Sequence, residues 1–280
     1  DDLRRKYRSS HLALHLQYGE QIELRLECPS RLPDDVRKVV APLQDRPIED
    51  LAGLMRRLNQ LQKLGHEVLI YPDAEEFIQQ RLFQTRIEER IAEIRRDPAA
   101  HPLRRELLKT ELLPYQMDGV AFAVGAGRAV LADDMGLGKT IQAVGVAELL
   151  AREAGIRKVL VICPASLKSQ WRTEIGRFSD RDCQLILGKA AERGQQYDND
   201  AFFTVCNYEQ VLRDVLDIER VRWDLIVLDE AQRIKNWEAK TTRVVKALKS
   251  PFALALSGTP LENRLDELYS VVQFIDDRRL

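Results

Sequence analysis

Apolar and polar side chains alternate along residues 11–28, on either side of a Tyr-Gly-Glu turn at 18–20. A period of two is typical of half-buried strands, so this segment predicts a β-hairpin. Apolar positions and turn residues downstream predict three further elements: a helix over 48–64, a short strand over 68–71 and a helix over 73–96, the last about 36 Å long. Together they predict a small α+β extension over residues 1–100.

The pattern changes after two prolines in residues 97–102, where we place a domain boundary because proline lacks the backbone donor that a helix needs. Short apolar runs then alternate with helical stretches, at residues 129–132, 159–163, 184–187, 202–205, 225–228 and 252–256. Continuous apolarity is typical of strands covered on both faces. Residues 101–280 are therefore predicted to form an α/β domain with a mainly parallel sheet flanked by helices.

Composition narrows the class of protein. The 43 Lys and Arg residues nearly balance the 44 Asp and Glu residues, which excludes a polybasic or acidic tail as the main feature. The apolar runs are far shorter than the roughly 20 residues of a membrane helix, and residues 1–20 are charged, so we expect a cytoplasmic, nucleoid-associated or nuclear protein with no membrane partner.

The four cysteines lack zinc-ligand spacing, which predicts free thiols and no structural metal. The chain starts without Met and is expected to be part of a longer protein.

A phosphate loop is predicted at residues 133–140, DDMGLGKT, between a strand and a helix over 141–154. Gly136 and Gly138 would let backbone N–H groups converge on phosphate oxygens, Lys139 would bring positive charge to the β and γ phosphates, and the Thr140 hydroxyl would face magnesium. Asp133 stands where the general pattern has glycine. The alternative is an ordinary turn with an exposed lysine.

An acidic pair, Asp229 and Glu230, directly follows the apolar run at 225–228. Proteins with parallel sheets place their ligands at such carboxyl ends of strands. A nucleotide hydrolase needs an acidic ligand for magnesium, here Asp229 with Thr140, and a group that orients the attacking water, here Glu230. Lys139, Asp229 and Glu230 are thus the candidate catalytic residues. The alternative is a solvated acidic pair at a strand end.

Six ordered stretches together resemble one family. They are LPYQMDG at 113–119, LADDMGLGKTIQ at 131–142, CPASLKSQW at 163–171, NYE at 207–209, DEAQRIKN at 229–236 and LSGTPLEN at 256–263. The chain resembles the first RecA-like lobe of the Swi/Snf-type ATPases, double-stranded DNA translocases of helicase superfamily two. Residues 1–100 weakly resemble the extension of bacterial members.

The resemblance implies ATP and Mg²⁺ as cofactors. It implies that Gln116 contacts adenine, since an amide can donate and accept at once; the alternative is a polar residue at a helix start. The remaining nucleotide-binding set lies in the phosphate loop: Asp134, Met135, Gly136, Leu137, Gly138, Lys139 and Thr140. Ser257 and Thr259 would couple the nucleotide site to lobe movement. Two positions depart from the family, Asp134 in place of Glu and Gln232 in place of His.

The resemblance also implies contacts with the DNA backbone, for which we select Ser166, Lys168, Tyr208, Lys235 and Asn236. Charge and hydroxyl donors suit phosphate and require no base reading. Trp171 is expected to anchor the core, because duplex DNA offers no splayed base for stacking. The arginines of 86–105 are interspersed with glutamates and are expected to form a solvated, paired face.

The predicted function is the ATP-binding lobe of a double-stranded DNA translocase, which hydrolyses ATP to ADP and phosphate when paired with a second RecA-like lobe. Arginines of that lobe would stabilise the transferred phosphoryl group, so this chain alone should hydrolyse little ATP. Two alternatives stay open. One is an RNA-directed helicase of the same superfamily, and the other is a non-catalytic module that docks a partner through residues 1–100.

Overall fold

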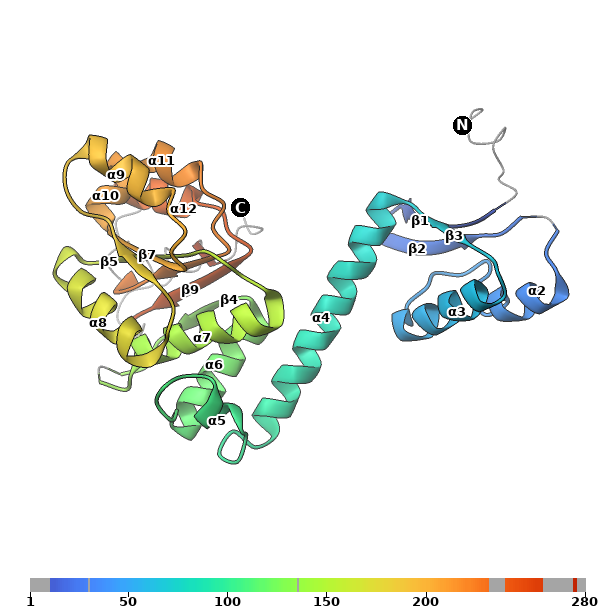
Figure 1. The fold of residues 1–280 in the computed structure, drawn as a ribbon, viewed down its shortest axis with the longest axis horizontal. Helices are drawn as coiled ribbons and strands as arrows, with labels where there is room; N and C mark the ends of the chain where they lie inside the picture. The colour runs from blue at the N-terminus through green and yellow to red at the C-terminus, as the bar shows by residue number, and fades with distance from the viewer. Residues whose placement is uncertain (1–10, 30, 135, 232–239, 259–273, 276–280) are drawn as a thin grey trace. The chain divides into compact units, whose positions relative to one another are not determined.

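A computed structural model of the chain describes residues 11–29, 31–134, 136–231, 240–258 and 274–275 (Figure 1). Its contacts divide the chain into two compact units, Asp1–Arg86 and Ile87–Leu280. The division falls within helix α4 (Pro72–Arg96), upstream of the proline-rich turn. The domain boundary expected near residue 100 stays a prediction.

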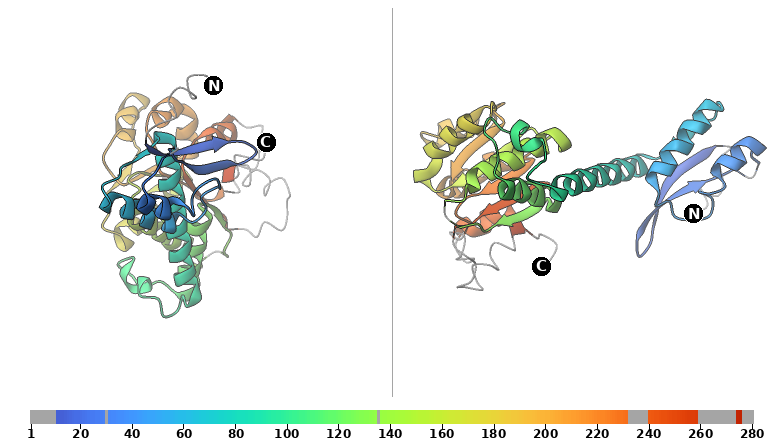
Figure 2. Two further views of the ribbon diagram at one scale, coloured as in Figure 1. Left: turned by 90° about the vertical axis from the view of Figure 1, so that its right-hand side faces the viewer. Right: turned by 90° about the horizontal axis from the view of Figure 1, so that it is seen from below.

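The first unit contains a three-stranded sheet in the order β2-β1-β3. Figure 2 shows its hairpin strands in blue. Strands β1 (Leu12–Tyr18) and β2 (Ile22–Glu27) form the predicted antiparallel hairpin, and β3 (Val68–Ile70) pairs parallel with β1. Helix α3 (Leu51–Lys63) was predicted, whereas helix α2 (Asp34–Val40) was not. Seven residues give too short a window for helical periodicity to be recognised.

Alternate residues of the hairpin form the core of the first unit. Leu14 lies opposite Leu26 and Leu16 lies opposite Leu24, so one face of the sheet is apolar. Leu54 and Leu61 of α3, seven residues apart and fully buried, share one face of their helix and belong to this core. The Asp50 side chain caps α3 by accepting a hydrogen bond of 2.8 Å from the Gly53 N–H.

The second unit contains a six-stranded sheet in the order β4-β9-β8-β5-β7-β6, and all of its pairings are parallel. The strands are β4 (Arg128–Leu131), β5 (Val159–Cys163), β6 (Cys183–Leu185), β7 (Phe203–Asn207), β8 (Leu225–Leu228) and β9 (Phe252–Leu256). These six strands and their parallel direction confirm the α/β class that the continuous apolar runs predict.

Helices cover both faces of this sheet (Figure 1). Helices α5 (Leu103–Glu106), α6 (Pro114–Ala126), α7 (Lys139–Ala154) and α8 (Lys168–Phe178) lie on one side. On the other side lie α9 (Ala190–Tyr197), α10 (Tyr208–Arg213), α11 (Val215–Glu219) and α12 (Lys240–Ala247). Strands β5 and β8 are consequently buried along their whole length. Within the described residues, no helix has both the length and the apolarity to cross a membrane.

The four cysteines are free thiols, as predicted. Cys163 and Cys206 are buried on the neighbouring strands β5 and β7, and the Cys163 thiol lies 3.8 Å from the Cys206 carbonyl oxygen. Burial raises the pKa of both thiols, which keeps them protonated at neutral pH. These side chains therefore act as small apolar groups of the core.

The stability of the first unit can be tested at Leu54. We expect Leu54→Ala to lower its free energy of unfolding by about 2–5 kcal/mol, because a buried leucine is replaced by a cavity. Exposed Leu69→Ala is the matched control and should change it little. Both described tryptophans, Trp171 and Trp223, lie in the second unit, so urea unfolding should be followed by circular dichroism. Equal losses in the two variants would contradict the proposed core.

Candidate nucleotide-binding site

Five strand ends bring the predicted motifs to one edge of the sheet. Strands β4, β9, β8, β5 and β7 are consecutive neighbours and run parallel, so their carboxyl ends share that edge. The segments that leave these ends are the phosphate loop after β4, Ser257 after β9, Asp229 after β8, residues 164–171 after β5 and Tyr208 after β7. Sequence stretches far apart in the chain therefore meet at one site.

The phosphate loop turns at two glycines and leads directly into α7. Gly136 and Gly138 have φ angles of 88° and 80°, in the left-handed region that glycine adopts without strain. A Cβ at Gly138 would lie 2.6 Å from Gln116 Nε2, so this position also needs the absence of a side chain. The loop therefore presents its backbone to the site at the N-terminus of a 16-residue helix, where N–H groups favour an anion.

Lys139, the first residue of α7, folds back over the loop. Its ammonium donates hydrogen bonds of 2.7 Å to the Asp133 carbonyl oxygen and 3.0 Å to the Asp134 carbonyl oxygen. Phosphate oxygens are stronger acceptors for an ammonium group than peptide carbonyls, because the bond then joins opposite charges. The donor set of Lys139 and glycine N–H groups thus fits a polyphosphate.

Gln116 lies beside the phosphate loop, and its amide is engaged in hydrogen bonds. The Oε1 atom accepts from the Leu113 N–H at 3.0 Å, and Nε2 donates to the Leu137 carbonyl oxygen at 3.2 Å. Tyr115, which the sequence reasoning did not select, donates its hydroxyl to the same carbonyl oxygen at 3.0 Å. Gln116 therefore joins the start of α6 to the loop, and its contact with adenine stays a prediction.

Gln142 is a second support of the loop that sequence reasoning missed. Its side chain is fully buried in the first turns of α7 and donates a 2.7 Å hydrogen bond to the carboxylate of Asp133. Asp133 is the residue that replaces the usual glycine of the loop. The sequence contained a signal for this contact, because a carboxylate in that unusual place needs a nearby donor and Gln142 lies two residues after the motif.

Asp229 and Glu230 leave the end of β8, as predicted. Asp229 is 9% exposed, and burial raises the pKa of its carboxyl above the usual range. Hydrogen bonds from the Trp171 indole and from the Glu230 N–H lower this pKa, as does the nearby charge of Lys139. The structure therefore brings the predicted magnesium carboxylate into the electrostatic field of the phosphate-loop lysine.

Glu230 adopts a backbone conformation that is unusual for its residue type. Its φ angle is 53°, in the left-handed region, where residues other than glycine carry strain of about 1–3 kcal/mol. Such strain persists when the surrounding structure fixes the residue, and it is concentrated at functional sites. The Glu230 N–H donates to Asp229 Oδ1 at 2.9 Å, so the strained turn also holds the neighbouring carboxylate.

The prediction that Lys168 and Tyr208 face DNA is wrong in this structure. Lys168 is 6% exposed, and its ammonium donates to the Ile186 carbonyl oxygen and to Gln210 Oε1. Tyr208 is 7% exposed and donates its hydroxyl to the Asp229 carbonyl oxygen at 2.6 Å. Both side chains point into the protein because α8 and α10 turn these faces toward the sheet.

The other predicted residues divide into three groups. Ser166 is exposed just before α8, where a phosphate could reach it, and Thr140 is half-buried at the start of α7. Ser257 is fully buried after β9, and its N–H bonds to the Leu131 carbonyl oxygen at 3.0 Å. Four predicted residues lie outside the described residues: Met135, Lys235, Asn236 and Thr259.

Four of the six arginines of residues 86–105 have acidic partners: Arg90, Arg95, Arg104 and Arg105. Arg90 bonds to Glu93 at 2.6 Å within α4, and Arg95 bonds to Asp118 of α6 at 2.9 Å. Arg104 forms an ion pair with Glu111. These pairs account for the charges of those four arginines without a nucleic acid.

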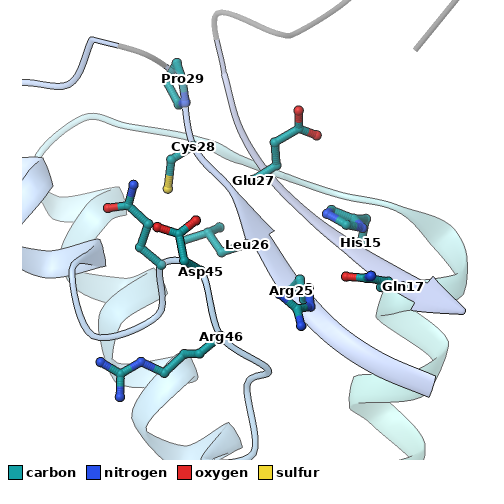
Figure 3. A pocket seen from close by; sticks show the side chains of 10 residues that line it. His15, Gln17, Arg25, Leu26, Glu27, Cys28, Pro29, Asp45 and Arg46 are labelled. Atoms are coloured by element: carbon teal, nitrogen blue, oxygen red, sulfur yellow. The ribbon is translucent and has the colours of Figure 1, made fainter. Parts of the chain in front are cut away.

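A pocket of about 400 Å³ lies in the first unit and contains none of the predicted site residues. Figure 3 shows His15 and Arg25 on the strands and Asp45 and Arg46 on the loop opposite them. Its lining carries both signs of charge, so it shows no preference for an anion or a cation. We assign it no ligand.

A parallel sheet with a phosphate loop and a carboxylate pair at the same edge, after strands β4 and β8, defines a RecA-like P-loop domain. The SNF2-related domain family matches residues 115–280, more than half of the chain, and the protein belongs to this family. The resemblance inferred from the six sequence stretches is thereby confirmed.

Similar proteins support this assignment. ISW1 of Saccharomyces cerevisiae, named as an ISWI chromatin-remodeling complex ATPase, is 33% identical over 59% of this chain and 16% of its own length. The DNA repair and recombination protein RAD54B of Mus musculus is 32% identical over 59% of this chain and 21% of its own. The Sulfolobus solfataricus SWI2/SNF2 ATPase core in complex with double-stranded DNA matches 61% of this chain and 36% of that chain, with 35% identity and a TM-score of 0.56.

The two ends of α7 offer a test of the loop geometry. Gly138 and Gly155 both have positive φ angles, but a Cβ meets Gln116 at Gly138 and nothing within 4 Å at Gly155. Either substitution to alanine should cost about 1–2 kcal/mol of stability. Gly138→Ala should in addition weaken binding of a fluorescent ATP analogue by about tenfold, the equivalent of one lost hydrogen bond. Equal affinities of the two variants would show that this glycine does not shape the site.

Proposed function

We propose that this chain is the ATP-binding lobe of an ATP-dependent double-stranded DNA translocase, working with Mg²⁺ and a second RecA-like lobe. The observation that carries the proposal is that the phosphate loop with Lys139, after β4, and Asp229, after β8, leave the same edge of the parallel sheet. A lysine in a phosphate loop and a carboxylate at the same edge of the sheet supply the two charges that a magnesium nucleotide needs.

Each residue has a distinct task in this proposal. The loop N–H groups and Lys139 bind and orient the phosphates, while Asp229 and the Thr140 hydroxyl would hold Mg²⁺, which supplies further neutralisation of phosphate charge when bound. Each Asp229 oxygen accepts one described hydrogen bond, which leaves lone pairs for a metal or its water ligands. Glu230 orients the water that attacks the γ phosphate. The second lobe adds positive charge opposite this edge.

Duplex DNA is the proposed track. Support comes from the Sulfolobus solfataricus homologue, which was solved with double-stranded DNA. On this chain, Ser166 and Ser169 are exposed at the N-terminus of α8, on the same edge of the sheet as the nucleotide residues. Hydroxyls at a helix N-terminus suit phosphate and read no base, so binding should be indifferent to sequence.

Nucleotide binding can be tested at Lys139. We expect Lys139→Ala to weaken binding of a fluorescent ATP analogue with Mg²⁺ by about 10- to 100-fold, because a charge-assisted hydrogen bond is removed. Lys249→Ala removes an exposed lysine just before β9, at the opposite edge of the sheet, and should bind as the wild type does. Fluorescence titration measures the nucleotide affinity of both variants. Nucleotide affinity that is indifferent to Lys139 would favour the interaction-module alternative.

Contact with DNA can be tested at Ser166. Ser166→Glu places a negative charge where phosphate is proposed, so it should weaken duplex binding and reduce the slope of log K against log salt by about 1. Gln195→Glu adds the same charge on exposed α9, across the sheet, and should change neither quantity. Fluorescence anisotropy of labelled duplex DNA across a salt series gives both the affinity and its salt dependence. Preference of the wild type for RNA duplexes would instead support the RNA-helicase alternative.

A further inference from the structure

Asp229 is held at three atoms. Its Oδ2 accepts a 2.8 Å hydrogen bond from the Trp171 indole N–H, and its Oδ1 accepts one from the Glu230 N–H at 2.9 Å. Its carbonyl oxygen accepts from the Tyr208 hydroxyl at 2.6 Å. A carboxylate with a donor on each oxygen cannot rotate freely, so its remaining lone pairs keep a fixed direction.

Trp171 is itself rigidly placed. It is 2% exposed, in the first turn of α8, and shares one buried face of that helix with Lys168, Ile175 and Phe178. The Lys168 ammonium, three residues before it, is anchored to Ile186 and Gln210. Helix α8 is therefore held in place by its buried apolar face and by the hydrogen bonds of Lys168. The Trp171 indole N–H reaches Asp229 from this fixed helix.

Tyr208 is tied to the same helix. It begins α10, whose start is closed by reciprocal bonds between Asn207 and Gln210, at 2.8 and 3.0 Å. Gln210 also accepts from Lys168 at 3.0 Å. The segments after β5 and β7 are thus bonded to each other and, through Trp171 and Tyr208, to Asp229.

We propose that Trp171 is a positioning residue, which orients the Asp229 carboxylate for Mg²⁺ and connects it to the exposed start of α8. This inference rests on the proposed function. Groups that hydrogen-bond to a metal ligand fix its orientation, and their loss lowers metal affinity by about 10- to 100-fold. Tyr208 supports the backbone of the same residue, so its effect should be smaller.

The test is Trp171→Phe in the whole 280-residue chain. Phenylalanine keeps an aromatic ring and removes the N–H donor. We expect half-maximal binding of a fluorescent ATP analogue to need about 10- to 100-fold more Mg²⁺ than in the wild type, with unchanged affinity when Mg²⁺ is absent. A general loss of packing would lower both affinities together.

Trp223→Phe is the matched control. Trp223 is also buried, at 3% exposed, and donates its indole N–H to the Ile218 carbonyl oxygen at 2.9 Å, at the amino end of β8. This variant loses the same atoms from the same domain and should keep the wild-type Mg²⁺ dependence. If Trp171→Phe fails to fold, Tyr208→Phe should show a smaller shift in the same direction.

A spectroscopic measurement separates positioning from packing. The indole ¹⁵N–¹H resonance of Trp171 should move on addition of Mg²⁺ with the nucleotide, and again in Asp229→Asn, whereas that of Trp223 should not. The inference would be overturned if Trp171→Phe left the Mg²⁺ dependence of binding unchanged, or if Asp229→Asn did not shift the Trp171 resonance. Either result would leave the proposed function standing. A wild-type chain that binds no nucleotide would overturn the proposed function and this inference with it.

Discussion

The parallel direction of the six strands in the second unit is the constraint on which the site depends. Because every pairing is parallel, every strand ends at the same edge, and each connection must return across a face of the sheet. The helices that make these returns cover both faces and bury β5 and β8 completely. The same geometry that produces the apolar core thus collects the polar groups where the strands end.

The polar groups at this edge are stabilised mainly by one another. Burial of Asp229 disfavours its charge, while the indole of Trp171 and the ammonium of Lys139 favour it. Lys139 in turn bonds to the carbonyl oxygens of the loop that precedes it. Buried polar groups are costly when unpaired, so each of these bonds supports the position of the next group as well as its own.

The sequence predicted β5 and β8 to the residue, because continuous apolar runs between turn residues mark strands covered on both faces. It also placed Lys139 and Asp229 at one edge, since strand ends of a parallel sheet coincide. It failed on Lys168 and Tyr208, whose directions depend on how α8 and α10 rotate against the sheet. A helical count from Trp171 and Ile175 would have put Lys168 on the buried face.

The burial of Lys168 changes how the two proposed functions of this edge, nucleotide binding and DNA binding, can be related. A lysine on the surface would contact DNA independently of the nucleotide, whereas a buried one links α8 to α10 behind the site. The exposed hydroxyl of Ser169 lies two residues before Trp171 in the first turn of α8, and Trp171 bonds to Asp229. The start of that helix is therefore connected to Asp229, the carboxylate proposed to bind magnesium, through one packed helix and one hydrogen bond.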